Sequence, residues 1–247
     1  MDVLISGVCG HMGKHVYDLV QQDSDLQYAG GVDVADGTSA LENVFEKFAD
    51  VNVDVDIIID FSFHGLIGDL LNFAIEKNIP AVIATTGHTD DEKQMIQDAA
   101  KKIPVFFASN YSIGIATLAE ISKKAASTLP DADIEIVEVH HTRKLDAPSG
   151  TALTLAENLK SVRQDANIVC GRNGLAKREP NDIGVNSVRL GNIVGIHEIQ
   201  IGTANETLTL KHEVHDRAVF ADGSIVAAKF LINQNPGLYS MSDIFSL

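Results

Sequence analysis

The chain has 247 residues, 45% of them hydrophobic, and a formal net charge of −15. This length suits one large domain or two modest ones, and the acidic balance argues against nucleic acid and anionic membrane surfaces, which the long-range field would repel. The two cysteines, Cys9 and Cys170, lie far apart and match no disulfide or metal spacing, so we expect a reducing cytoplasm. The sequence shows no signal-peptide pattern and no apolar run long enough to span a membrane.

The first half of the chain alternates short apolar runs with helical patterns. Strands are predicted at 2–7, 27–33, 55–62, 80–87 and 104–109, and helices at 12–23, 64–78, 90–102 and 114–128. The apolar runs are continuous, as expected for strands that a parallel sheet buries on both faces. The segment that begins at Thr89 has a threonine cap and an acidic first turn, which favour a helix start there. This βαβ series predicts a Rossmann-type doubly wound parallel sheet.

After about residue 130 the pattern changes to alternating apolar and polar residues. Segments 133–141, 186–202 and 206–215 predict an open mixed sheet, largely antiparallel, with one face wet or covered by a partner. Helices are expected at about 150–163 and at 223–234. The fold class is therefore α/β: a dinucleotide-binding domain formed by 1–111 and 217–247, with an α+β domain, 112–216, inserted between them.

The first predicted strand ends in a glycine turn, GVCGHMG, with the spacing GxxGxxG. Gly7 permits the tight turn, Gly10 lets the backbone approach a pyrophosphate, and Gly13 lets the following helix pack closely. Asp33 ends the second strand, where a carboxylate can accept hydrogen bonds from an adenosine ribose. An ordinary tight turn is the alternative, but its place between the first strand and first helix favours nucleotide binding. The expected contacts are Gly7, Val8, Cys9, Gly10, His11, Met12 and Asp33.

Polar residues also close the next three predicted strands, in the segments DFS, TTG and SNY. Each alone is explained by strand-end caps and turns. Together with the glycine turn they favour a cofactor tract, because open α/β sheets bind ligands at the carboxyl ends of their strands. The additional contacts expected there are Ala84, Thr85, Thr86, Ala108, Ser109, Asn110 and Tyr111.

The segment EVHHTRKLDAPSGTA, 138–152, gathers two histidines and two cations in an otherwise acidic chain. The run that ends in Ser149, Gly150 and Thr151 precedes a predicted helix, where hydroxyls and backbone N–H groups are expected to face outward toward an anion. Lys144 adds a point charge, and a histidine adds a group that titrates near neutrality. The loop is predicted to hold a small anion and pass it a proton. No histidine spacing matches a metal motif, so no metal is expected.

The motifs SGVCGHMG, DFS, ATTG, SNYSIG, EVHHTRKLDAPSGTA, RLGNIVGIHE and FADGSIVAAKFL together resemble the 4-hydroxy-tetrahydrodipicolinate reductase (dihydrodipicolinate reductase) family over essentially the whole chain. The resemblance implies that His140 is the catalytic acid/base and Lys144 the proton donor. It implies that His141 contacts substrate and that a substrate carboxylate binds Ser149, Gly150 and Thr151.

The resemblance also implies a homotetramer formed through the sheet of the second domain. One apolar face of that sheet is expected to need more cover than a single helix supplies. Its residues are Ile193, Ile199, Ile201, Leu208 and Leu210.

Two positions depart from the family pattern. His11 stands where an arginine is usual near the cofactor phosphates, which predicts a weaker contact, and Ala84 replaces a glycine with little expected effect. NADH is expected to be preferred over NADPH, because Asp33 would repel a 2′-phosphate and Asp36 adds a second negative charge. The first cation beyond them is Lys47.

The implied reaction is the NAD(P)H-dependent reduction of 4-hydroxy-tetrahydrodipicolinate, a small dicarboxylate, to tetrahydrodipicolinate in diaminopimelate and lysine biosynthesis. Two alternatives stay open: another two-domain NAD(P)-dependent dehydrogenase acting on a small carboxylate, and a non-enzymatic nucleotide sensor. The loop with its histidine pair, Lys144 and Ser-Gly-Thr run argues against both, because neither needs that combination.

Overall fold

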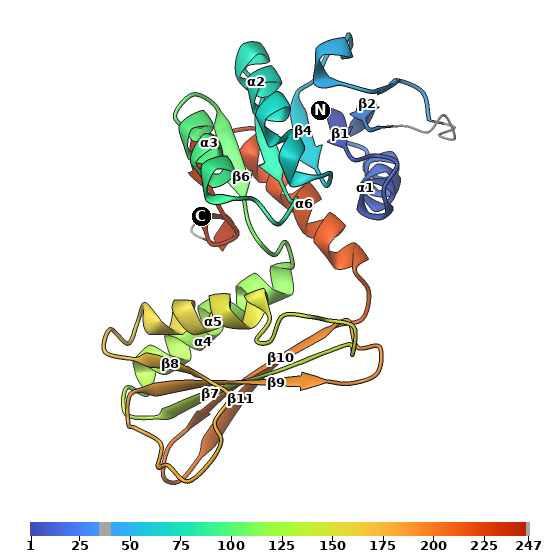
Figure 1. Ribbon diagram of the computed structural model, residues 1–247. Helices are drawn as coiled ribbons and strands as arrows, with labels where there is room; N and C mark the ends of the chain where they lie inside the picture. The colour runs from blue at the N-terminus through green and yellow to red at the C-terminus, as the bar shows by residue number, and fades with distance from the viewer. Residues whose placement is uncertain (35–40, 246–247) are drawn as a thin grey trace. The chain divides into compact units, whose positions relative to one another are not determined.

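The computed structural model describes residues 1–34 and 41–245, and the chain divides into two compact units (Figure 1). The first unit comprises Met1–Ser112 and Ala218–Leu247, and the second comprises Ile113–Arg217. Asp36, on which part of the expected NADH preference rests, lies outside the described residues.

Within the described ranges, the first unit has one seven-stranded sheet in the order β12-β6-β5-β4-β1-β2-β3, and all its neighbours pair in parallel. The strands are β1 Asp2–Ser6, β2 Gln27–Val32, β3 Val44–Phe45, β4 Ile57–Asp60, β5 Ala81–Ile83, β6 Pro104–Phe107 and β12 Gly237–Tyr239. The strand order reverses direction at β1. The carboxyl end of β1 is therefore the topological switch point of a doubly wound sheet. The predicted fold class is thus confirmed, although the two short edge strands β3 and β12 were not predicted.

The helices of the first unit are α1 His11–Gln22, α2 Ile67–Lys77, α3 Asp90–Ala100 and α6 Ala218–Leu231, with 3₁₀ turns η1 Phe48–Asp50, η2 His64–Leu66 and η3 Asp243–Phe245. Helix α3 begins as predicted: Thr89 Oγ1 accepts from the Glu92 backbone N–H at 3.3 Å, and Glu92 Oε2 accepts from the Thr89 N–H at 2.7 Å. This reciprocal pair satisfies two donors at the helix start. Helix α6 begins five residues before the predicted 223.

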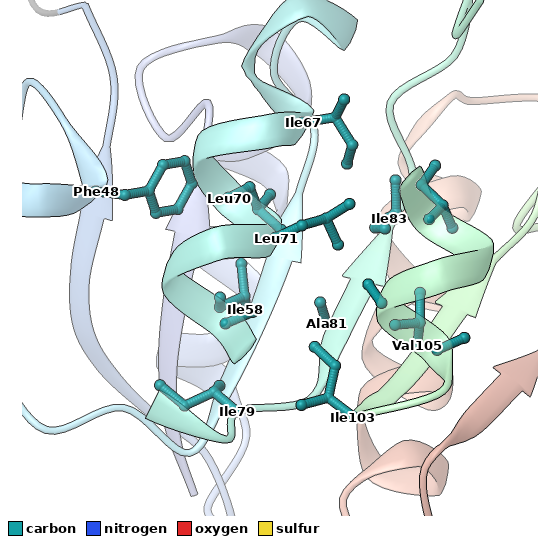
Figure 2. Close-up of a cluster of buried hydrophobic side chains, with 14 of the residues drawn as sticks. Phe48, Ile58, Ile67, Leu70, Leu71, Ile79, Ala81, Ile83, Ile103 and Val105 are labelled. Atoms are coloured by element: carbon teal, nitrogen blue, oxygen red, sulfur yellow. The ribbon is translucent and has the colours of Figure 1, made fainter. Parts of the chain in front are cut away.

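A hydrophobic core lies between the sheet and helices α2 and α3 (Figure 2). Ile58, Ile83 and Val105 come from three neighbouring strands and are fully buried. Leu70 and Leu71 of α2 pack onto them. Burial of continuous apolar strands in this way holds the carboxyl ends of β4, β5 and β6 at one edge of the sheet.

The second unit, all of whose residues are described, has a five-stranded sheet in the order β11-β10-β7-β9-β8. Its strands are β7 Asp133–His140, β8 Asn167–Cys170, β9 Asp182–Arg189, β10 Gly195–Gly202 and β11 Thr207–Val214, and its helices are α4 Ile113–Thr128 and α5 Gly150–Lys160. The open mixed sheet is confirmed. It is not largely antiparallel, however, because the β7–β9 and β8–β9 pairs are parallel and the β10–β7 and β10–β11 pairs antiparallel.

The prediction of one strand over 186–202 is wrong. The chain turns at 190–194, where Gly191 has a φ of 53°, and β9 and β10 lie on opposite sides of β7. A residue with positive φ interrupts the extended backbone that a continuous strand needs.

Helices α4 and α5 both cover one face of this sheet (Figure 1). Two helices, rather than one, cover the apolar face singled out from the sequence, and they bury Ile199 and Ile201 completely, at 0% exposure. Leu208, near the edge, keeps 40% of its surface exposed. None of the helices in the described ranges combines the length and apolarity that crossing a bilayer requires.

Candidate active site

The glycine turn after β1 leaves no room for a side chain at Gly7 or Gly13. Gly7 has a φ of 80°, and a Cβ atom there would lie 2.4 Å from the backbone oxygen of Phe61. A Cβ atom on Gly13 would lie 2.0 Å from the backbone oxygen of Gly7, so α1 packs directly on the turn. Gly10 is the N-cap of α1 and supplies no side-chain hydrogen bond to the first turn. Such a helix start suits the diphosphate of a dinucleotide, because its N–H groups point at the anion.

Asp33 lies against the same turn. Its Oδ2 accepts a hydrogen bond of 2.8 Å from the Cys9 backbone N–H. The structure therefore brings together the end of β2 and the glycine turn, as expected of a ribose-binding acid. Val8 is fully buried, and a Cβ atom on Gly31 would meet its Cγ1 at 2.4 Å, so its side chain serves packing.

Hydrogen bonds link the polar residues at the ends of β4 and β5. Thr85 Oγ1 accepts from the Ser62 N–H at 2.8 Å, and Ser62 Oγ donates to Asp60 Oδ1 at 2.5 Å. Burial raises the pKa of Asp60, and these hydrogen bonds oppose that rise. The Tyr111 hydroxyl donates to the Ile83 carbonyl at 2.8 Å, and this side chain is 2% exposed. The Tyr111 side chain therefore belongs to the buried interior of the first unit. Two other residues expected to contact the cofactor, Thr86 and Ser109, are exposed.

In the second unit, His140 belongs to a buried cluster on the helix-covered face of β7. Its Nδ1 lies 2.5 Å from Oε2 of Glu138, two residues earlier and therefore on the same face of the strand. Both guanidinium Nη atoms of Arg189 donate to the two Glu138 oxygens at 2.9 Å. The Ser149 backbone N–H donates to Glu138 Oε1 at 3.2 Å.

The register of the sheet assembles this cluster. Arg189 on β9 is the lateral partner of His140, and His197 on β10 is the lateral partner of Glu138. Lateral partners on neighbouring strands share a face, so three strands supply one site. Sequence reasoning missed Glu138, Arg189 and His197. The alternation along β7 could have revealed Glu138, but the other two required the register.

The charges of the cluster are matched. Burial alone would raise the pKa of the Glu138 carboxyl, but hydrogen bonds from Arg189, His140 and Ser187 outweigh it and lower the pKa to about 2. Burial and, to a smaller extent, the nearby His140 lower the pKa of His197 to about 4. Glu138 is therefore an anion and His197 a neutral imidazole at neutral pH.

Ser149 is the N-cap of α5, with its Oγ accepting from the Ala152 N–H at 3.2 Å. The hydroxyl also lies 3.3 Å from His197 Nε2, and the residue is 1% exposed. The expectation that this hydroxyl faces outward is wrong, because capping draws it inward. Gly150 is exposed and Thr151 half-buried at the helix start.

The Asp146 carboxylate interacts with both Lys144 and the start of α5. Lys144 Nζ lies 2.8 Å from Oδ1 of Asp146. This hydrogen bond lowers the pKa of Asp146, and the Gly150 backbone N–H adds to the lowering. Lys144 and the start of α5 thus hold a carboxylate between them.

His141 lies apart from the buried cluster. Its Nε2 is 3.4 Å from Nη2 of Arg217, and Arg143 donates to Asn192 Oδ1 at 2.6 Å. Burial lowers the pKa of His141, and the positive charges of Arg143 and Arg217 lower it further. Within the described ranges, no group of three or more His, Cys, Asp or Glu side chains is arranged to hold a metal ion.

Family comparisons cover both units. The family model for dihydrodipicolinate reductase, N-terminus, matches residues 1–111, and that for dihydrodipicolinate reductase, C-terminus, matches residues 114–245. The chain belongs to the dihydrodipicolinate reductase family. Membership confirms the resemblance predicted from the sequence motifs.

Individual relatives of this family match the chain over nearly their full length. The 4-hydroxy-tetrahydrodipicolinate reductase of Caldanaerobacter subterraneus subsp. tengcongensis is 42% identical over 98% of this chain and 97% of its own. That of Alkaliphilus oremlandii is 40% identical over 100% and 99%. The dipicolinate-bound dihydrodipicolinate reductase from Paenisporosarcina sp. TG-14 superposes with a TM-score of 0.83 at 26% identity, covering 99% of both chains.

The dihydrodipicolinate reductase family is a family of oxidoreductases, and the chain is one of them. Its fold and membership indicate a nicotinamide cofactor, which the glycine turn and the start of α1 fit. They also favour the reductase over the alternative of another dehydrogenase on the same two-domain plan.

The lowered pKa of His197 predicts an acid-sensitive fold. The unfolded chain, with an ordinary histidine pKa of 6.5, binds this proton more readily than the folded chain, with a pKa of about 4. Stability is therefore complete above the unfolded pKa and is lost as pH falls toward the folded one. Between about pH 7 and about pH 5, His197 should reduce the unfolding free energy by about 2 kcal/mol.

Urea unfolding at both pH values measures this loss, with His197→Gln as the comparison. The variant should show a smaller decrease by that amount. Equal decreases in the two proteins would contradict the buried neutral state of His197.

Proposed function

We propose that the chain reduces 4-hydroxy-tetrahydrodipicolinate to tetrahydrodipicolinate in the diaminopimelate route to lysine. The observation that carries the proposal is the arrangement of one short segment. The buried Glu138 carboxylate holds His140, and Lys144 and the start of α5 hold a second carboxylate, that of Asp146. The names of the relatives and the dipicolinate in the solved reductase support a dicarboxylate ring as substrate. We place the enzyme in the cytoplasm, a reducing compartment that suits the free Cys9 and Cys170.

The substrate loses water to form a conjugated cyclic imine, which accepts one hydride and one proton. A bound nicotinamide nucleotide supplies the hydride. His140 is the proton donor in this proposal: its Nδ1 is engaged by Glu138, which leaves Nε2 for the substrate. Lys144 and the Gly150 N–H bind a substrate carboxylate in place of Asp146, with Thr151 beside them. Ser149 shapes that helix start through its cap, and His141 contacts substrate from outside the buried cluster.

Replacing His140 with glutamine should lower kcat by roughly 10²–10³, the range of acid–base catalysis, with NADH affinity unchanged. Lys144→Met should act differently, raising the substrate KM more than it lowers kcat, because it removes a binding charge. Steady-state kinetics on both variants separates the roles, with exposed His215→Gln as a matched control. A His140→Gln variant within a few-fold of the parent would show that His140 is not the donor.

For the cofactor we propose that NADH is preferred over NADPH. Asp33 lies at the glycine turn through its bond to Cys9, where a carboxylate suits a ribose 2′-hydroxyl and repels a 2′-phosphate. A partly exposed charge contact of this kind corresponds to about 1–2 kcal/mol.

Two substitutions at this position test the preference. Asp33→Ala removes both the charge and the acceptor for the Cys9 N–H, whereas Asp33→Asn can keep the acceptor. Both should move the NADH/NADPH ratio of kcat/KM toward NADPH by roughly 10-fold. Parent enzyme that is more efficient with NADPH, or a ratio that neither variant moves, would refute the assignment.

We also propose a homotetramer assembled through the uncovered face of the second unit's sheet. Val188, Val139 and Ile196 are lateral partners on three adjacent strands, and they form an apolar row across that face. Half-buried or exposed apolar rows of this kind favour contact with another chain.

Light scattering should return four times the 26.5 kDa chain mass. Val188→Glu should dissociate the assembly, because a charge would be buried at the contact. Val226→Glu, a change at an equally exposed valine on α6, should leave the mass unchanged. A parent protein that scatters as a monomer at micromolar concentration would exclude the tetramer.

A further inference from the structure

We propose that Glu138 and Arg189 are positioning residues for proton transfer: together they hold His140 with Nδ1 protonated and Nε2 directed to the substrate. This inference rests on the proposed role of His140 as proton donor. It assigns a function to two side chains that were not among the site residues predicted from the sequence.

The Glu138 carboxylate determines which imidazole nitrogen carries the proton. As an ionised carboxylate it can only accept, and it lies 2.5 Å from His140 Nδ1. Nδ1 must therefore be the donor of this bond, and the lone pair or transferable proton is at Nε2.

Arg189 fixes the carboxylate in turn. Its two Nη atoms bind one Glu138 oxygen each at 2.9 Å, a bidentate geometry that sets the plane of the carboxylate. Its Nη2 also donates to the Asp146 carbonyl at 2.6 Å. Arg189 thus joins the His140 site to the segment that carries Lys144. A lysine, with a single compact ammonium group, cannot make the same set of contacts.

The surroundings of Nε2 agree with its use as the working nitrogen. A Cβ atom on Gly195 would lie 3.1 Å from Nε2, so glycine leaves this side of the ring uncrowded. His197 packs edge-on against the His140 ring, with centroids 5.2 Å apart. The titratable and charged groups around His140 are Glu138 on β7, Arg189 on β9, His197 on β10, and His141 and Lys144 in the loop.

Glu138→Gln keeps the shape of the side chain and removes its charge. Loss of the charge removes the acceptor-only group that keeps the proton on Nδ1, so Nε2 of His140 is no longer held in the form that the substrate needs. We expect kcat to fall by roughly 10–100-fold, as for other residues that orient a functional group, with NADH affinity unchanged. Glu135→Gln is the matched control: Glu135 lies on the same strand and pairs with Arg178. It should leave kcat unchanged.

A double-mutant cycle separates this inference from the proposed function. If Glu138 acts through His140, Glu138→Gln should cost nothing further in a His140→Gln background. An additive loss would overturn the positioning role while leaving His140 as donor. Full activity of His140→Gln alone would instead refute the proposed role of His140 as proton donor, on which this inference rests.

Arg189→Lys should reproduce the fall in kcat in milder form, and parent-like kinetics in this variant would count against its role. Nitrogen-15 NMR of the parent enzyme keeps the test independent of how the variants fold. The His140 ring should carry its proton on Nδ1 at mildly alkaline pH, with that proton shifted strongly downfield. A proton on Nε2 under those conditions would overturn the proposal.

Discussion

The buried carboxylate of Glu138 constrains how β7, β9 and the start of α5 are arranged in the second unit. An ionised carboxylate without water costs several kcal/mol unless donors surround it. Arg189 from β9, His140 on the same strand and the Ser149 N–H at the start of α5 provide those donors. The parallel pairing of β7 with β9 and the path of the loop back to α5 are therefore coupled. A slip of one residue in that register would turn Arg189 to the other face and leave the anion unpaired.

The first unit relies on backbone atoms rather than on ionised side chains. Its site depends on backbone atoms that approach one another too closely for a Cβ atom, at Gly7 and Gly13, and on a helix start without a side-chain cap. Steric room and backbone dipoles suit a diphosphate, which needs several N–H donors around a diffuse charge. In the proposed reaction the second unit delivers one proton from one nitrogen, and the ionised side chains around that nitrogen are fixed by bidentate contacts.

Charge distribution reconciles these sites with the acidic composition. A chain with net charge −15 repels anions at long range, yet cofactor and substrate are both anionic. Lys144, Arg189 and Arg217 lie around the same loop and strand ends of the second unit. Their contacts are local: Lys144 with Asp146, Arg189 with Glu138, and Arg217 with His141. Contacts of this kind act within a Debye length, where the remote negative surface of the chain is largely screened.

The sequence by itself determined what depends on neighbours a few residues apart. The period of hydrophobicity distinguished the buried parallel strands from the alternating ones, the cap at Thr89 marked a helix start, and the glycine turn and histidine loop marked the two candidate sites. Only the tertiary structure decided that 186–202 is two strands on opposite sides of β7, that Arg189 and His197 join His140 in one buried cluster, and that the Ser149 hydroxyl turns inward. These outcomes depend on strand register and on packing between residues some fifty positions apart, because no local pattern specifies which distant strand a residue will face.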